Sequence, residues 1–189
     1  MGRVIAIVLV AGLVLLPVYI ALQPSDFAIE RTAAIQAPAS AIYPHLQSLR
    51  AMNEWSPFAK GDPAMKITYS GPDSGVGASS SWQSDKSGSG SSTITRAVPN
   101  EEVEMRLDFT APMTATNTAR FMLQPQGDAT RVTWRMEGHR GFLAKAFGLV
   151  VNMDKVVGGE FEKGLASVKT LAESEARAAP ATATTTAPE

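Results

Sequence analysis

Alternation of apolar and polar side chains dominates the middle of the chain and predicts β-strands. Within residues 101–109, Val103, Met105, Leu107 and Phe109 alternate with charged residues, which is the pattern of a strand with one buried face. Similar segments recur between turns rich in Gly, Pro, Asn and Asp. Together they predict about seven antiparallel strands, at residues 27–37, 65–69, 78–84, 91–98, 101–109, 115–123 and 130–138.

Helical spacing of apolar residues appears after the first strand and again after the last. Ile42, Leu46 and Leu49 share one helical face and predict a short helical pair before residue 59. Residues 142–172 predict one long final helix. Its apolar face is expected to carry Phe142, Leu149, Val150, Met153, Val157, Phe161, Gly164 and Leu165.

Glycines in the final helix predict how it meets the sheet. Gly164 lies within the apolar face, where a missing side chain lets the helix approach closely. Gly158 and Gly159 lie off that face and lower helix propensity. We therefore expect a bend or a short break at this pair.

A meander of strands with segregated helices indicates an α+β domain. A single sheet must cover its apolar face, and the final helix is the large cover that the sequence offers. We therefore expect a helix-grip arrangement: a curved antiparallel sheet wrapped around a long C-terminal helix, with two short helices after the first strand. Such an arrangement generally leaves a cavity between sheet and helix.

The segment Val4–Leu22 contains 19 residues without a charge. About 20 apolar residues of helix span a bilayer, and Arg3 before the run favours a cytoplasmic side for that end. We expect a transmembrane helix that anchors the chain in the inner membrane, with the domain on the extracytoplasmic, periplasmic side. A cleaved signal peptide is the alternative, although the run is longer than usual and Tyr19-Ile20-Ala21 is a poor cleavage site.

The chain is therefore divided into four parts. Residues 1–23 are the anchor and residues 24–26 a linker. One folded domain occupies residues 27–175. Residues 176–189 form an Ala/Thr/Pro-rich tail that has too few large apolar side chains to stay ordered.

Charge and cysteine content exclude several classes of function. The chain carries 17 Lys+Arg against 18 Asp+Glu, so it has no electrostatic basis for binding nucleic acid. The absence of cysteine excludes thiol catalysis, disulfides and cysteine-ligated metals. The two histidines, His45 and His139, do not have the spacing of a metal site. We expect neither a metal nor a cofactor.

Three ionisable side chains are candidates for acid–base chemistry. Asp154 and Glu160 fall at the two borders of the apolar face of the final helix. A carboxylate there could reach a pocket between helix and sheet, or it could point to solvent or pair with an arginine. His45 lies in the short helical region, where a solvent-facing role is the alternative to a catalytic base. Burial would decide among these roles.

Several stretches of the chain resemble a known superfamily. They are APASAIYPHLQSL, WSPF, SGPDSGVGA, TITRAVPNEEVEMRLDF, TRVTWRMEG and GGEFEKGL. They are similar to the SRPBCC (START-like, helix-grip) superfamily, and within it to the polyketide cyclase/dehydrase-like branch. The resemblance extends over residues 27–173. It implies a lipophilic pocket rather than a shared catalytic set, and the N-terminal run fits membrane-attached members.

Large side chains on the predicted inward faces could line such a pocket. Plain core packing is the alternative for most of them, although methionine suits a pocket that adapts its shape. The candidates for ligand contact are Trp82, Met105, Phe109, Trp134, Met136, Met153 and Val157.

The leading functional hypothesis is binding or sequestration of a lipophilic small molecule at the membrane. One alternative is a polyketide cyclase/dehydratase-type enzyme that uses Asp154, Glu160 or His45. The other is a cavity-free protein-interaction domain. Alternating charges along residues 102–108 and 131–135 argue against a large apolar patch on the outer face of the sheet.

Overall fold

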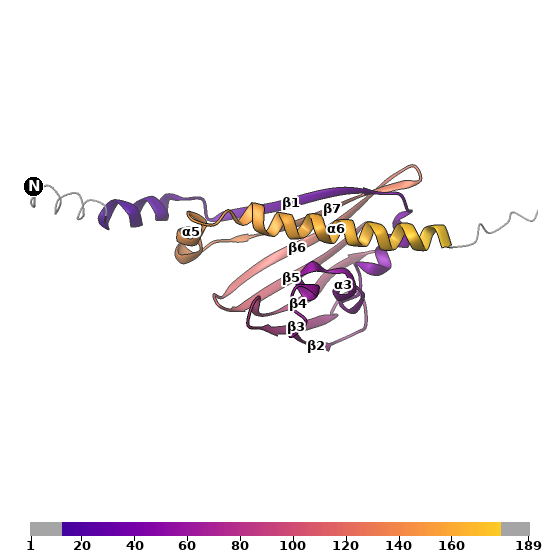
Figure 1. Ribbon diagram of the computed structural model, residues 1–189, viewed down its shortest axis with the longest axis horizontal. Coiled ribbons are helices and arrows are strands. Elements are labelled where there is room, and N and C mark those ends of the chain that lie inside the picture. The colour runs from indigo at the N-terminus through magenta and orange to yellow at the C-terminus, as the bar shows by residue number, and fades with distance from the viewer. Residues whose placement is uncertain (1–12, 179–189) are drawn as a thin grey trace, which may run out of the picture.

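Seven strands form one antiparallel sheet that curves beside the last helix (Figure 1). The computed structural model describes residues 13–178. The strand order is β1-β7-β6-β5-β4-β3-β2, so each strand from β2 to β7 pairs with its neighbour in sequence and β1 lies beside β7. The strands are β1 (Asp26–Ile35), β2 (Lys66–Ser70), β3 (Ser79–Ser84), β4 (Gly88–Val98), β5 (Glu102–Ala111), β6 (Ala115–Gln126) and β7 (Ala129–His139).

Short helical segments connect β1 to β2, and two helices follow β7. The predicted α+β, helix-grip architecture is confirmed, with strand ends that differ from the prediction by a few residues. The segments are α2 (Ala39–Ile42), the 3₁₀ turn η1 (Tyr43–His45), α3 (Leu49–Trp55), α4 (Pro57–Lys60), α5 (Phe142–Gly148) and α6 (Met153–Ala178). Residues 13–22 are also helical.

Aromatic packing joins α6 to the concave face of the sheet. Phe161 of α6 stacks on Trp134 of β7, with ring centroids 4.1 Å apart and planes 9° apart. Trp55 of α3 meets Trp134 edge-on, and Phe121 of β6 lies tilted beside it. Burial of a large apolar side chain contributes about 1.5–3 kcal/mol, so these rings hold the helix and the sheet together.

Gly164 allows this close approach, as predicted. A Cβ atom at position 164 would lie 2.6 Å from the ring of Trp134 and 3.2 Å from that of Trp55. Carbon atoms in well-packed interiors do not approach one another so closely. The missing side chain is therefore what lets α6 rest directly on the aromatic rings.

The prediction of one final helix with a break at Gly158 and Gly159 is wrong. Helix α5 ends at Gly148, and a separate helix, α6, begins at Met153. Asn152 Oδ1 accepts a hydrogen bond from the backbone N–H of Lys155 at 3.0 Å, which caps the first turn of α6. α6 then runs unbroken through both glycines.

Two consequences of this break also differ from the prediction. Gly158, expected off the buried face, is buried against the guanidinium of Arg31. Phe142, Leu149 and Val150, expected in the core, are exposed. They are exposed because α5 is a separate helix, so the apolar stripe of α6 does not extend into it.

Charged side chains form cross-strand ion pairs on the convex face. Arg120 of β6 lies 2.6 Å from Glu104 of β5 and 3.1 Å from Glu137 of β7. Arg135 lies 3.2 Å from Glu30 of β1. The bond from Arg120 holds the pKa of Glu104 below its ordinary value of 4.5. This face is a network of charges, as the alternation predicts, and offers no support for an apolar protein-docking surface.

The N-terminal run is described only from residue 13 onward. Among residues 13–178, no helix is both long and apolar enough to cross a membrane. The predicted anchor is the run Val4–Leu22, and its first nine residues, 4–12, lie outside the described residues. At the other end, α6 continues to Ala178, past the predicted domain end at residue 175. The rest of the predicted tail, residues 179–189, is likewise outside the described part.

We expect Gly164→Ala to destabilise the domain, because its Cβ would meet the Trp134 ring. Overpacking of this kind lowers the free energy of unfolding by about 1–3 kcal/mol. Gly159→Ala is the matched control, since a Cβ there meets nothing within 4 Å and removal of a helical glycine stabilises by about 0.4–1 kcal/mol. Urea unfolding of both variants checks this. Equal effects at the two positions would show that α6 does not depend on contact at Gly164.

Candidate functional site

Sheet register gathers a set of inward side chains at one end of the concave face. We call this the proximal end: β1 begins there at Asp26, paired with His139 at the end of β7. The turn between β5 and β6 lies at the same end, because Phe109 pairs with Ala115. Figure 1 shows that α5 and the helix of residues 13–22 are also at this end.

Trp82 and Phe109 form an aromatic pair on the proximal part of the concave face. Their ring centroids lie 5.6 Å apart at an angle of 78°, an edge-to-face contact. Gly90 stands between them in the sheet, opposite both residues. A Cβ on Gly90 would lie 2.6 Å from the indole of Trp82. Because Gly90 has no side chain, the Trp82 indole can lie across β4. Both aromatic residues remain half-buried.

Asn117 places a polar group on the same face of the sheet, on β6. It lies on β6 opposite Leu107 of β5 and Gly138 of β7. The side chain is buried, and its Oδ1 has no hydrogen-bond partner within the described part of the chain. The amide lies directly over Gly138, whose missing side chain leaves the space that it occupies. An unpaired buried acceptor costs about 1–3 kcal/mol, so a purely structural core would not be expected to contain it.

Helix α6 covers only part of this surface. It packs mainly against β1, and its first turns carry Met153 and Val157, both half-buried. Leu107 and Phe109 lie on the central strand β5 and Trp82 lies on β3, three and five strands away from β1. These three half-buried residues therefore lie away from β1, the strand that α6 packs against most.

The seven predicted ligand contacts divide into two groups. Met105 and Trp134 are core residues, only 3% and 6% exposed. Met136 is buried beside Ala119. Trp82 and Phe109 meet each other, while Met153 and Val157 lie on α6. The structure therefore brings part of the set to the proximal end and places the rest in the packed centre.

The pocket that stands out among the described residues does not lie at these side chains. It holds about 40 Å³ and lies elsewhere, between α3 and the β2–β3 turn, with Arg50 stacked 4.2 Å from the Tyr69 ring. Sites for small molecules usually hold about 300–1,000 Å³. The concave face is thus packed in this conformation.

The three acid–base candidates lie apart and pair with different partners. Asp154 lies 3.1 Å from Arg31, which lowers the pKa of that carboxyl. Glu160 lies 2.7 Å from Lys163.

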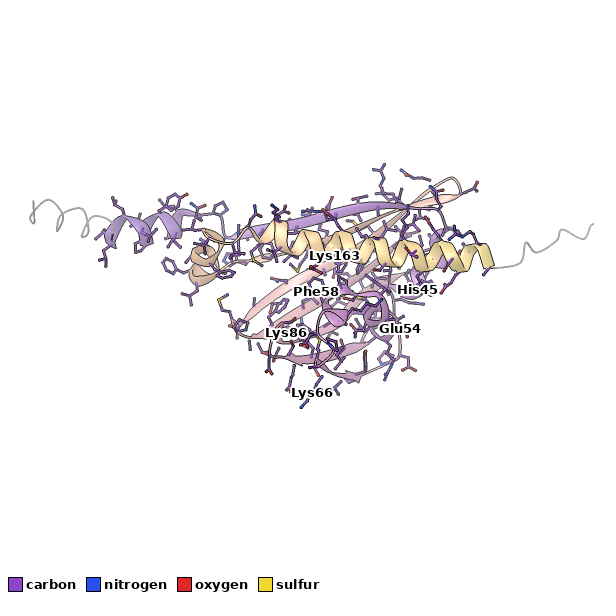
Figure 2. The ribbon with its side chains drawn as sticks, in the orientation of Figure 1. His45, Glu54, Phe58, Lys66, Lys86 and Lys163 are labelled. Carbon is purple, nitrogen blue, oxygen red and sulfur yellow. The ribbon has the colours of Figure 1, made fainter. Side chains whose placement is uncertain are left out.

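His45 Nε2 lies 2.8 Å from Glu175 near the end of α6 that is remote from α5 (Figure 2). The other histidine, His139, lies 3.1 Å from Asp26 at the proximal end. Within residues 13–178, no group of three or more His, Asp or Glu is placed to hold a metal ion.

Sequence reasoning missed Asn117, Leu107 and the two glycines beneath Trp82 and Asn117. The signal for Asn117 was present. It stands in phase with Ala119, Phe121 and Leu123 on β6, so the alternation placed an amide on the buried face. The glycines could not be found in this way, because their role depends on cross-strand neighbours.

The chain matches none of the curated proteins with which it was compared. Solved structures with the same fold include a protein from Chromobacterium violaceum, with a TM-score of 0.56 and 15% identity over 78% of this chain and 98% of that one. A hypothetical protein from Helicobacter pylori has a TM-score of 0.60 at 10% identity, covering 78% and 89% of the two chains. The Aha1 dimer from Colwellia psychrerythraea has a TM-score of 0.56 at 17% identity, covering 78% and 96%.

These structural likenesses establish the fold alone. The sequence itself is matched over residues 26–173 by the model of the family described as polyketide cyclase / dehydrase and lipid transport. This range begins at the first residue of β1 and ends within α6, so it includes every strand of the sheet. The chain therefore belongs to the polyketide cyclase / dehydrase and lipid transport family.

Proposed function

We propose that the domain binds a lipophilic small molecule at the proximal end of its concave face. The observation that carries the proposal is Asn117, an amide whose buried oxygen is unpaired within the described chain. It pairs across the sheet with Leu107, and its oxygen lies over Gly138, where the Phe27 ring also lies. A ligand with an apolar body and one hydroxyl would cover the apolar residues and donate a hydrogen bond to Asn117 Oδ1. Membership of a family described by lipid transport supports the same class of ligand.

Binding requires the packed face to open. Phe58 of α4 packs edge-on against both Trp134 and Phe161 yet remains 40% exposed. Figure 2 shows it beside α6. Outward rotation of this ring would open space beside Trp134 and Phe161, and movement of Trp82 off Gly90 would open space beside Phe109. The ligand then selects an open conformation that is a minor population without it.

The run Val4–Leu22 would hold this domain at a membrane. Its 19 uncharged residues and Arg3 on its flank support an anchor with the domain on the extracytoplasmic side. The proximal end, which carries the proposed site, is the end joined to this run. An apolar ligand could thus pass between lipid and site without crossing water.

The two alternative functions find less support. A cyclase or dehydratase needs an acid and a base that converge on one substrate, whereas Asp154, Glu160 and His45 each pair with a different partner. An interaction domain would use the convex face, which carries the ion-pair network of Arg120 and Arg135.

Phe109→Ala is expected to weaken binding of a fluorescent fatty alcohol to the domain from Pro24 onward by about tenfold, because loss of an aromatic contact costs about 1.5 kcal/mol. Thr110→Ala is the matched control, since its side chain is exposed and it follows Phe109 on the same strand. Fluorescence titration measures both. Equal affinities for the two variants, with folding intact by circular dichroism, would place the ligand elsewhere.

Asn117→Leu separates a functional amide from a structural one. Leucine has nearly the same shape and removes the unpaired oxygen, so we expect the melting temperature to rise by a few degrees. Affinity for the fatty alcohol should fall, while affinity for the corresponding alkane should not. A fall in melting temperature together with unchanged binding of the alcohol would contradict the proposed role.

The anchor makes its own prediction. Alkaline phosphatase, which needs an oxidising compartment to fold, should be active when fused after Glu189. Intact mass of membrane-extracted protein should include Val4–Leu22. A soluble product that begins near Gln23 would identify the run as a cleaved signal, and an inactive fusion would place the domain in the cytoplasm.

A further inference from the structure

The loop between β7 and α6 exposes a concentrated group of large apolar side chains. Leu143 is 70% exposed and Val150 is 82% exposed. Phe142, Phe147 and Leu149 are also exposed. Most soluble surfaces contain single exposed apolar residues, whereas a contiguous group marks a site of contact. We call these five residues the α5 patch.

The α5 patch is held beside the helix of residues 13–22. Lys145 Nζ of α5 donates a hydrogen bond to the carbonyl of Ala21 at 3.1 Å. The backbone N–H of Arg140 donates to the carbonyl of Ser25 at 2.7 Å. Ile20 is buried although its neighbours Tyr19 and Ala21 are exposed. Figure 1 shows the two helices at the same end of the domain.

The length and position of the apolar run indicate what covers the patch. Nine of its residues, 4–12, precede the described chain, and the rest form the exposed helix that ends at Leu22. If a bilayer takes up this run, its surface lies close to residue 22. The contacts of Lys145 and Arg140 keep α5 within a few residues of that level.

Charges around the patch fit a membrane surface. Lys155 is exposed beside the apolar residues and can reach anionic headgroups. Arg140 and Lys145 add positive charge at the same margin, where Arg140 lies over the Phe27 ring and Lys145 donates to the carbonyl of Ala21. The neighbouring acids are already paired: Asp154 with Arg31 and Asp26 with His139. The segment therefore has the apolar face and cationic margin of a helix that lies in the interface.

We propose that the α5 patch is a membrane-docking surface that inserts into the same bilayer as the anchor. The inference rests on the proposed anchor but goes beyond it, because a flexible tether alone would leave the domain free to rotate. Docking through α5 fixes the proximal end against the membrane. Met113, which is 41% exposed in the β5–β6 turn, then also faces lipid.

The absence of cysteine makes a site-specific test direct. Single variants Leu143→Cys, Leu16→Cys and Asp128→Cys of the full chain carry a nitroxide label in nanodiscs of phosphatidylcholine and phosphatidylglycerol. Leu16 reports the anchor. Asp128 is an exposed control in the β6–β7 turn, at the other end of the sheet. Relaxation by oxygen and by a nickel chelate gives the depth of each label. Val150→Cys repeats the measurement at a second patch position.

We expect the labels at positions 16, 143 and 150 to favour oxygen over the nickel chelate several-fold, and the label at 128 to favour the chelate. A lipid-buried label at 16 with water-exposed labels at 143 and 150 would overturn docking and leave the anchor intact. Water exposure at all positions would overturn both proposals. The label at 143 could instead be shielded from both oxygen and the nickel chelate, with the shielding lost on dilution. That result would show that a second copy of the chain covers the patch, and it would also overturn docking.

Discussion

The close contact between α6 and the sheet at Gly164 determines how the rest of the domain is arranged. The glycine lets Phe161 stack on Trp134 at 4.1 Å, and the rings of Trp55 and Phe121 complete the cluster. This cluster fills the centre of the concave face. Hydrogen bonds along β1, from Lys169 Nζ to the carbonyl of Ala34 at 2.7 Å and from Gln36 N–H to Glu173 at 2.8 Å, then fix the direction of the helix.

Because the centre is filled, the ends of the concave face differ in character. Toward the end of α6, His45 and Glu175 close the domain with a polar pair. At the proximal end, half-buried apolar side chains surround a buried amide whose oxygen is unpaired. A folded domain gains stability by replacing such a group with an apolar one. Its presence is most simply understood as a stability cost retained for recognition.

The same end carries the α5 patch and the helix that continues the apolar run. Three features thus coincide: an apolar chain segment, an exposed apolar helix and a polar group within an apolar face. Each has its own physical origin, in the sequence of the run, in the interruption of the final helix at Asn152 and in the register of β6. If the proposed anchor lies in a bilayer, their coincidence gives the proposed lipid site a short path to it.

Local patterns predicted much of the fold. Alternation gave the seven strands, and the position of Gly164 within an apolar stripe gave the close helix contact. The same apolar stripe led to a wrong prediction of one continuous helix from residue 142. Both α5 and α6 carry apolar residues, and the sequence signal that separates them is the Asn152 cap.

The site was predicted less well. Alternation predicts that Trp134 and Phe109 share one face of the sheet. It does not predict that α6 covers Trp134 and leaves Phe109 half-buried. The partners of Asp154 and His45 are Arg31 and Glu175, each more than a hundred residues away, and no local pattern reveals such pairs.

Methionine methyl groups offer the most direct test of the proposed site. A fatty acid with a nitroxide on its chain, added to the ¹³C-methyl-methionine-labelled domain from Pro24 onward, broadens the methyl signals that lie near the bound chain. Met136 lies on β7 two residues before Gly138, over which the Asn117 amide lies, and Met153 begins α6 at the proximal end. Met122 lies on β6 facing away from Asn117's side of the sheet, and Met65 precedes β2. The account predicts selective broadening of Met136 and Met153. Equal broadening of all four, or broadening of Met65 and Met122 alone, would contradict it.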